Sequence, residues 1–134
     1  MKELEFLADG KWHRSQTKKF MDVFNPSTGE VIARAPCCTP DEIAVAVSSA
    51  RKAFAPWADT PVIKRVQVLY KLRELLIENE RRLAVLVATE NGKSLADAEG
   101  DVLKAREATE VALNAPSLLM GQSMRDASAG VDTV

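Results

Sequence analysis

The residues of this chain best suited to covalent chemistry are two adjacent cysteines, Cys37 and Cys38. A cysteine becomes a nucleophile when a basic neighbour favours its thiolate, and the one histidine, His13, is the only imidazole available for that role. Free cysteines otherwise behave as small apolar side chains. We therefore predict that both thiols are inert and partly buried, and that His13 is a surface residue of a hairpin. One histidine and two cysteines also cannot complete a tetrahedral zinc site.

Two carboxylate pairs, Glu90 with Glu99 and Asp97 with Asp101, are the candidates for a metal or acid–base site. The second pair has i,i+4 spacing, which is typical of a solvated helix face, and we predict that role. Trp12 and Trp57 flank predicted turns and could mark a partner surface, although aromatic side chains more often serve as packing anchors.

Phosphate-binding motifs are missing from the sequence. The glycines stand at positions 10, 29, 92, 100, 121 and 130, so no Gly-x-Gly occurs, and neither a dinucleotide fingerprint nor a phosphate loop can be drawn. The run from Gly121 lacks the second glycine of a nucleophile elbow. The sequence therefore predicts no catalytic, cofactor-binding or metal-ligating residue.

Composition narrows the class of protein and its partners. The chain is 46% hydrophobic and 28% charged with a net charge of -1, and its charges are interspersed, so it lacks the basic stripe that drives binding to nucleic acid or anionic lipid. Charges interrupt the short apolar run of residues 1–10, which argues against a signal peptide or anchor. We expect a cytoplasmic chain that binds neither nucleic acid nor membrane.

Short strands are predicted in the first part of the chain, over about residues 5–35. Asp9-Gly10 is a two-residue hairpin signal between residues 5–8 and 11–13. A second strand pair, residues 20–24 and 30–35, is joined by a turn that contains Pro26 and Gly29.

Helices are predicted over about residues 40–120. Thr39 to Glu42 reads as a capping box, and an apolar stripe of Ile43, Val47, Ala50 and Phe54 must pack on another element before Pro56 ends the helix. Thr60-Pro61 predicts the start of a second helix whose buried face comprises Val62, Val66, Leu69, Leu72 and Leu76. A third, capped by Asn79, would bury Leu83, Leu86 and Val87 and stop at Gly92.

Ser94 and Asp97 predict the cap of a fourth helix that reaches about Leu113. One face carries mostly small residues and is expected to pack closely on a neighbour; its members are Leu95, Ala98, Val102, Ala105, Thr109 and Ala112. Pro116 is expected to kink or end this segment, and the residues after Gly121 to form a loop that enters a strand.

Several motifs together resemble the N-terminal portion of the aldehyde dehydrogenase superfamily. They are residues 25–32 (NPSTGEVI), 54–57 (FAPW) and 89–94 (TENGKS). Residues 95–102 (LADAEGDV) and 115–124 (APSLLMGQSM) resemble the CoA-acylating methylmalonate and malonate semialdehyde dehydrogenases.

The resemblance implies an α/β fold, with two hairpin-like strand pairs followed by a layer of three to four helices. Residues 1–122 would form the N-terminal part of the NAD-binding domain, and residues 123–134 the start of an arm used in oligomer formation. The parent enzyme would use NAD and coenzyme A and form a homo-oligomer, a dimer or a tetramer. The family's catalytic cysteine, oxyanion-hole asparagine and nicotinamide-binding segments lie beyond these residues, and Cys37 and Cys38 do not match that cysteine.

Two functional hypotheses follow. In the first, the chain is the catalytically silent scaffold part of a (methyl)malonate semialdehyde dehydrogenase and binds neither NAD nor coenzyme A by itself. In the second, it is a remnant that associates with itself or docks on intact subunits through unsatisfied helix faces, since exposed apolar faces favour association.

Overall fold

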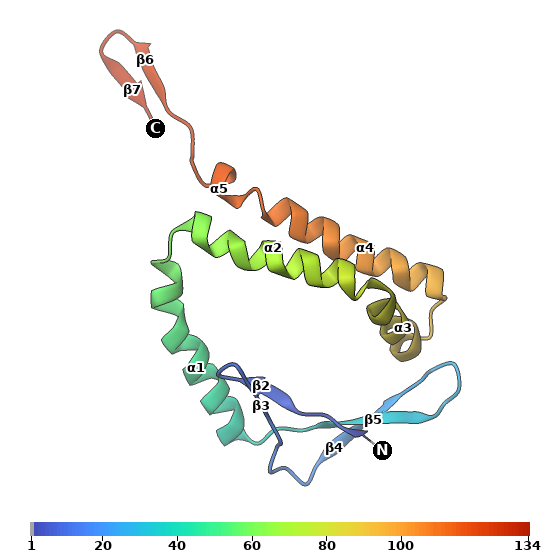
Figure 1. Cartoon of the computed structure of the whole chain (residues 1–134). Helices are drawn as coiled ribbons and strands as arrows, with labels where there is room; N and C mark the ends of the chain where they lie inside the picture. Colours follow the sequence, from blue (N-terminus) through green and yellow to red (C-terminus); the bar gives the residue numbers. More distant parts are fainter. Residues whose placement is uncertain (1) are drawn as a thin grey trace.

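A computed structural model describes residues 2–134, with the side chains of residues 124–127 left out of the description. The elements follow the order expected of the α/β class, with strands first and helices after them (Figure 1). A short two-stranded ribbon then stands away from the helices at the C-terminal end. Across the described residues, no helix combines the length and apolar character needed to cross a membrane.

The strands form two small sheets in the first part of the chain. β2 (Phe6–Ala8) and β3 (Lys11–His13) make the predicted hairpin around Asp9-Gly10. β4 (Phe20–Phe24) and β5 (Val31–Pro36) make the second antiparallel pair. β1 (Lys2–Glu3), which no sequence pattern predicted, adds to the second pair by parallel pairing with β5.

Helix α1 (Pro40–Ala58) begins at the predicted capping box, because Thr39 Oγ1 accepts from the Glu42 N–H and the Glu42 carboxylate accepts from the Thr39 N–H. The prediction that Pro56 ends the helix was wrong. The helix continues through Pro56 to Ala58. Its last carbonyls are then hydrogen-bonded by the residues that follow: the Asp59 N–H donates to Ala55 O at 3.0 Å, and the Thr60 hydroxyl donates to Pro56 O at 2.8 Å.

Helices α2 (Val62–Glu78) and α3 (Glu80–Asn91) follow, but two of their predicted caps do not form. Pro61 occupies the N-cap position of α2 because Thr60 is used at the end of α1. Asn79 stands at the N-cap of α3 without a capping hydrogen bond, since its Oδ1 accepts from Arg82 Nε and its Nδ2 donates back to Leu75 O. Gly92 does end α3 in the left-handed conformation, with φ of 70°.

Helix α4 (Leu95–Ala112) is capped by Ser94 as predicted, and a separate short helix, α5 (Ala115–Leu118), carries Pro116 in its first turn. Strands β6 (Met124–Ser128) and β7 (Val131–Thr133) pair antiparallel after the loop that follows Gly121. The expected loop entering a strand is therefore confirmed.

The core lies between α3 and α4. Ala84 and Ala98 are both 0% exposed and pack with Val102, which confirms the close approach predicted for the small-residue face of α4. On α2, α3 and α4, four predicted core positions are exposed instead; they are Leu72, Leu86, Ala105 and Ala112.

Candidate functional site

The candidate nucleophiles do not form a catalytic pair with His13. His13 is exposed, its Nε2 lies 3.1 Å from Ala8 O, and its ring stacks on Phe6 at 5.5 Å. Its interactions are therefore within its own hairpin. Cys37 is exposed, which corrects its predicted partial burial, whereas Cys38 is half-buried.

The acidic candidates are held by neighbouring side chains on exposed helix surfaces. Glu99 pairs with Arg81, and Asp101 pairs with Lys93. Asp97 accepts a hydrogen bond from the Ser94 hydroxyl at 2.6 Å. The solvated-face interpretation of Asp97 and Asp101 is confirmed. Glu90 is exposed near the end of α3.

The tryptophans do not act as packing anchors. Trp12 is 67% exposed and Trp57 is 49% exposed. The expectation that both serve as packing anchors at the edge of the helical layer was wrong, because the hairpin and α1 meet through other residues. Ser49 of α1 donates to Asp9 at the hairpin turn, at 3.2 Å, and Ala46 and Ala53 border the same junction.

Glu42 forms the most highly connected polar cluster of the strand region. Its Oε1 accepts from the Gln16 N–H, and its Oε2 from the Ser15 hydroxyl and the Thr39 N–H, each at 2.7 Å. These bonds lower the pKa of Glu42 from 4.5 to about 2, with the Gln16 N–H as the largest cause, then Ser15 and Thr39. Glu42 thus joins the β3–β4 linker to the first turn of α1.

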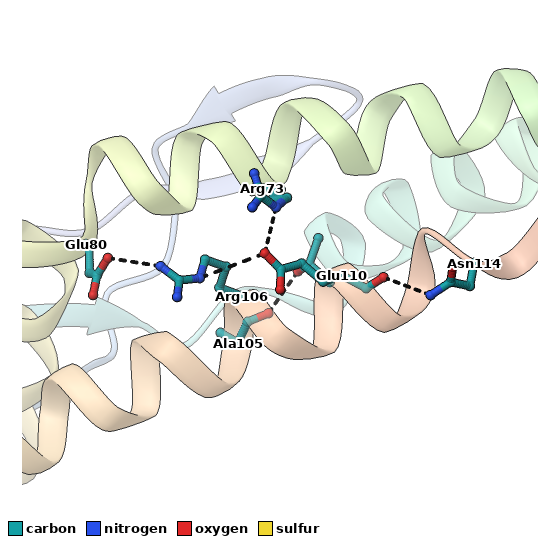
Figure 2. Close-up of polar contacts among 7 residues, drawn as sticks. Arg73, Glu80, Ala105, Arg106, Glu110 and Asn114 are labelled. Carbon is teal, nitrogen blue, oxygen red and sulfur yellow. Dashed lines mark hydrogen bonds and ion pairs between the residues drawn. The ribbon is translucent and has the colours of Figure 1, made fainter.

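A second polar cluster joins α2 to α4, which lie side by side (Figures 1 and 2). Arg73 Nε donates to Glu110 Oε1 at 2.7 Å, and the Arg106 guanidinium lies 3.5 Å from Glu80 Oε2 and 4.0 Å from Glu110 Oε1. Two arginines and two glutamates balance each other. The cluster therefore cross-links helices and offers no unpaired charge to a ligand.

Neither well-capped helix offers its N-terminus to a phosphate. A helix N-terminus attracts anions when its free N–H groups face the ligand. At α1 the carboxylate of Glu42 occupies that place, and at α4 Ser94 and Asp97 do. At these two helices the first turn is therefore occupied by side chains of the chain itself.

What the described residues do present is unpartnered apolar surface. The whole predicted stripe of α1 is exposed, including Phe54 at 73%. On α2, Val68, Leu72 and Leu75 follow each other at spacings of four and three, which places them on one side of the helix, and all three are exposed. These two faces can bind another apolar surface.

Sequence reasoning missed the polar cross-links. The capping box identified Glu42, but nothing in the sequence pairs it with Ser15 and Gln16. Arg73 and Glu110 were recognisable as charged residues that interrupt apolar helix faces, which is a weak signal. The sequence does not indicate that these two residues pair with each other.

Comparison with known proteins agrees with the resemblance. The aldehyde dehydrogenase family matches residues 12–134. Malonate-semialdehyde dehydrogenase 2 of Oceanobacillus iheyensis is 43% identical over 124 residues, which cover 92% of this chain and 26% of that protein. The human acylating methylmalonate-semialdehyde/malonate-semialdehyde dehydrogenase, a mitochondrial protein, is 42% identical over 96% of this chain and 24% of its own length.

Solved structures agree as well. A methylmalonate-semialdehyde dehydrogenase from Oceanimonas doudoroffii superposes with a TM-score of 0.87 at 32% identity, over 98% of this chain and 27% of that one. A Sinorhizobium meliloti protein described under the same enzyme name, and crystallised with NAD, gives a TM-score of 0.86 at 33% identity.

The chain spans about a quarter of the length of the relatives it matches. Within that quarter, the order of strands and helices, the family match and the superposition agree over nearly every residue. The chain belongs to the aldehyde dehydrogenase family.

Proposed function

We propose that this chain is the N-terminal scaffold part of an NAD-dependent, CoA-acylating (methyl)malonate semialdehyde dehydrogenase. The observation that carries the proposal is the 43% identity to a malonate-semialdehyde dehydrogenase over nearly the whole chain. The enzyme would oxidise a semialdehyde to an acyl-CoA with NAD as the oxidant. Both the family position and the crystallisation of a similar protein with NAD support that cofactor.

In this proposal the chain supplies support rather than chemistry. His13 interacts within its own hairpin, Glu99 and Asp101 pair with Arg81 and Lys93, and the N-termini of α1 and α4 are capped by the chain's own side chains. Residues 1–122 would carry part of the cofactor domain without contacting the cofactor. The isolated chain would bind neither NAD nor coenzyme A, and the complete enzyme would be cytoplasmic.

Oligomer formation is the second part of the proposal. An isolated two-stranded ribbon is marginally stable in water, and the ribbon of β6 and β7 stands away from the helices (Figure 1). We assign residues 123–134 to an arm that pairs with a neighbouring subunit in a dimer or tetramer.

A chimera tests the enzymatic proposal. This chain replaces the matching segment of the Oceanobacillus iheyensis protein, and the unaltered protein is the control. We expect the chimera to form NADH from malonate semialdehyde only when NAD and coenzyme A are both present. A folded chimera without this activity, beside an active control, would contradict the proposal.

An alternative function is a docking module that acts as a separate polypeptide. The exposed faces of α1 and α2 favour it.

A further inference from the structure

The four asparagines of the chain differ in what holds their side chains. The side chains of Asn25, Asn79 and Asn114 are each hydrogen-bonded to the backbone of a nearby residue. Asn91, the last residue of α3, is exposed, and within the described part of the chain no hydrogen bond holds its side chain. The Asn91 amide is therefore free to react.

The residue after an asparagine decides how readily its amide reacts with the backbone. The backbone nitrogen of that residue attacks Cγ, its proton passes to the amide nitrogen, which leaves as ammonia, and a cyclic imide forms. Water then opens the imide at either carbonyl and leaves an aspartyl or an iso-aspartyl residue. Asn91 precedes Gly92, whose lack of a Cβ favours ring closure. The other three precede a proline, which has no N–H to lose, a glutamate and an alanine.

The end of α3 holds Gly92 in a position that opposes this reaction. The Gly92 N–H donates to Ala88 O at 2.9 Å. The nitrogen that must attack therefore already donates its proton to the helix, and ring closure requires the peptide to turn out of this bond. Gly92 also packs against the β4–β5 turn, since a Cβ built on Gly92 would lie 2.7 Å from Pro26 Cγ. The turn thus packs directly on the residue whose backbone has to move.

We propose that Asn91-Gly92 is a self-modification site at which the chain deamidates, and that the contacts of Gly92 with Ala88 and Pro26 slow the reaction until the end of α3 opens. Water is the co-reactant, and ammonia is released. Such openings are local and require less free energy than global unfolding. The inference is independent of the proposed function, because it depends only on the residues at this junction.

Modification weakens the junction at which it occurs. Both products place a carboxylate at the C-terminal end of α3, where the helix dipole disfavours negative charge, beside the exposed Glu90. The iso-aspartyl product also carries the main chain through the side-chain carbons, which lengthens the link between α3 and Gly92 and disturbs its close fit to Pro26. The reaction is therefore a one-way change that loosens the helices from the strand region.

Peptide mapping of the 134-residue chain tests the proposal. Trypsin releases residues 83–93, which contain Asn91 and no other side-chain amide, and mass spectrometry distinguishes the amide from the acid. A synthetic peptide of the same residues is too short to form a stable helix in water and gives the rate without the fold. At mildly alkaline pH we expect the folded chain to convert about ten- to a hundredfold more slowly than the peptide, because only the opened fraction reacts. Asn79 and Asn114 should stay unmodified over the same time.

A pair of proline variants tests the contact that slows the reaction. Pro26→Ala removes the ring that packs on Gly92 and should speed the conversion of Asn91 at least about threefold. Pro40→Ala is the matched control, because it removes an exposed proline at the other end of β5 from the β4–β5 turn and increases the entropy of the unfolded chain in the same way. Circular dichroism checks that both variants keep their helices. If Pro26→Ala does not fold, the unaltered chain in rising urea replaces it, and its rate should approach that of the peptide.

Three results would overturn the proposal. They are no detectable conversion of the folded chain over about a hundred half-lives of the peptide, equal rates in the folded chain and the peptide, and equal acceleration by Pro26→Ala and Pro40→Ala. If only the urea series can be measured, a rate that stays unchanged as the chain unfolds takes the place of the third result. The modified chain, separated by ion exchange, should also unfold at a lower urea concentration than the unmodified chain, and an unchanged midpoint would overturn the weakening of the junction.

Discussion

Gly92 at the end of α3 meets Pro26 in the β4–β5 turn so closely that a Cβ added to Gly92 would lie 2.7 Å from Pro26 Cγ. The contact joins the strand region to the helices at a point far along the chain from their covalent connection through α1. In Figure 1 the β4–β5 turn reaches towards α3 and completes a ring of elements. Both residues belong to the motifs that carried the family resemblance.

Replacing Gly92 with alanine tests this contact. Gly92→Ala must accommodate a left-handed backbone with φ of 70° and a clash with the proline ring. Gly29→Ala is the control, because its φ is 75° but nothing lies within 4 Å of the added Cβ. We expect Gly92→Ala to lower the free energy of urea unfolding by about 1–3 kcal/mol more than Gly29→Ala does. Equal losses would show that the contact with Pro26 contributes nothing.

Local signals in the sequence predicted most of the elements. The capping box at Thr39, the Ser94 cap, the stop at Gly92 and the Asp9-Gly10 hairpin all depend on residues within a few positions of each other. Each of these was confirmed. They are the part of the fold that a single sequence can specify.

The failures involve partners that lie far apart in the sequence. The pairing of β1 with β5, the bonds from Ser15 and Gln16 to Glu42, and the contact of Pro26 with Gly92 have no local signature. The exposure of several helix faces was also predicted wrongly, for a second reason. Apolar periodicity predicts which face of a helix is to be buried, but it does not say whether the burying surface lies in the same chain.

Glu42 should make the stability of the strand region depend on pH. Because its pKa is lowered from 4.5 to about 2 in the folded chain, its contribution is complete above pH 4.5 and is lost as the pH falls towards 2. Glu42→Gln should remove this part of the pH dependence, as measured by urea unfolding across the acid range. An unchanged acid response would mean that the cluster does not stabilise the fold.

Removing one hydrogen-bond donor should shift the pKa of the Glu42 carboxyl. Ser15→Ala takes away the hydrogen bond to Glu42 Oε2, which measures 2.7 Å, and leaves the backbone donors of Gln16 and Thr39 in place. We expect the pKa of Glu42 to rise, because hydrogen bonds to the carboxylate favour its charged form. Carboxyl titration by NMR measures this, and an unmoved pKa would rule out the Ser15 bond.

Larger side chains at the contact between α3 and α4 should destabilise the fold. Ala98 is 0% exposed against Ala84, whereas Ala105 on the same helix is exposed. Ala98→Leu should therefore destabilise the chain by about 1–3 kcal/mol through overpacking. Ala105→Leu, the control, should be nearly neutral. Similar unfolding midpoints for the two variants would contradict the close packing of these helices.

The Arg73–Glu110 pair should show measurable coupling. Both side chains are about 40% exposed, so solvent screens the pair, and we expect a coupling energy of roughly 0.5–1 kcal/mol in a double-mutant cycle with alanine. Lys71 and Glu74, an i,i+3 pair that is more exposed on both sides, provide the comparison and should couple less. Equal coupling energies in the two cycles would show that the Arg73–Glu110 pair stabilises the fold no more than an ordinary surface pair.

In our proposal, the chain supports an enzyme without carrying its chemistry. The most direct measurement is NADH formation by the purified 134-residue chain supplied with malonate semialdehyde, NAD and coenzyme A. We predict no NADH above the rate without protein. Turnover by the chain alone that disappears in Cys37→Ser or Cys38→Ser would contradict the claim and assign the chemistry to these residues.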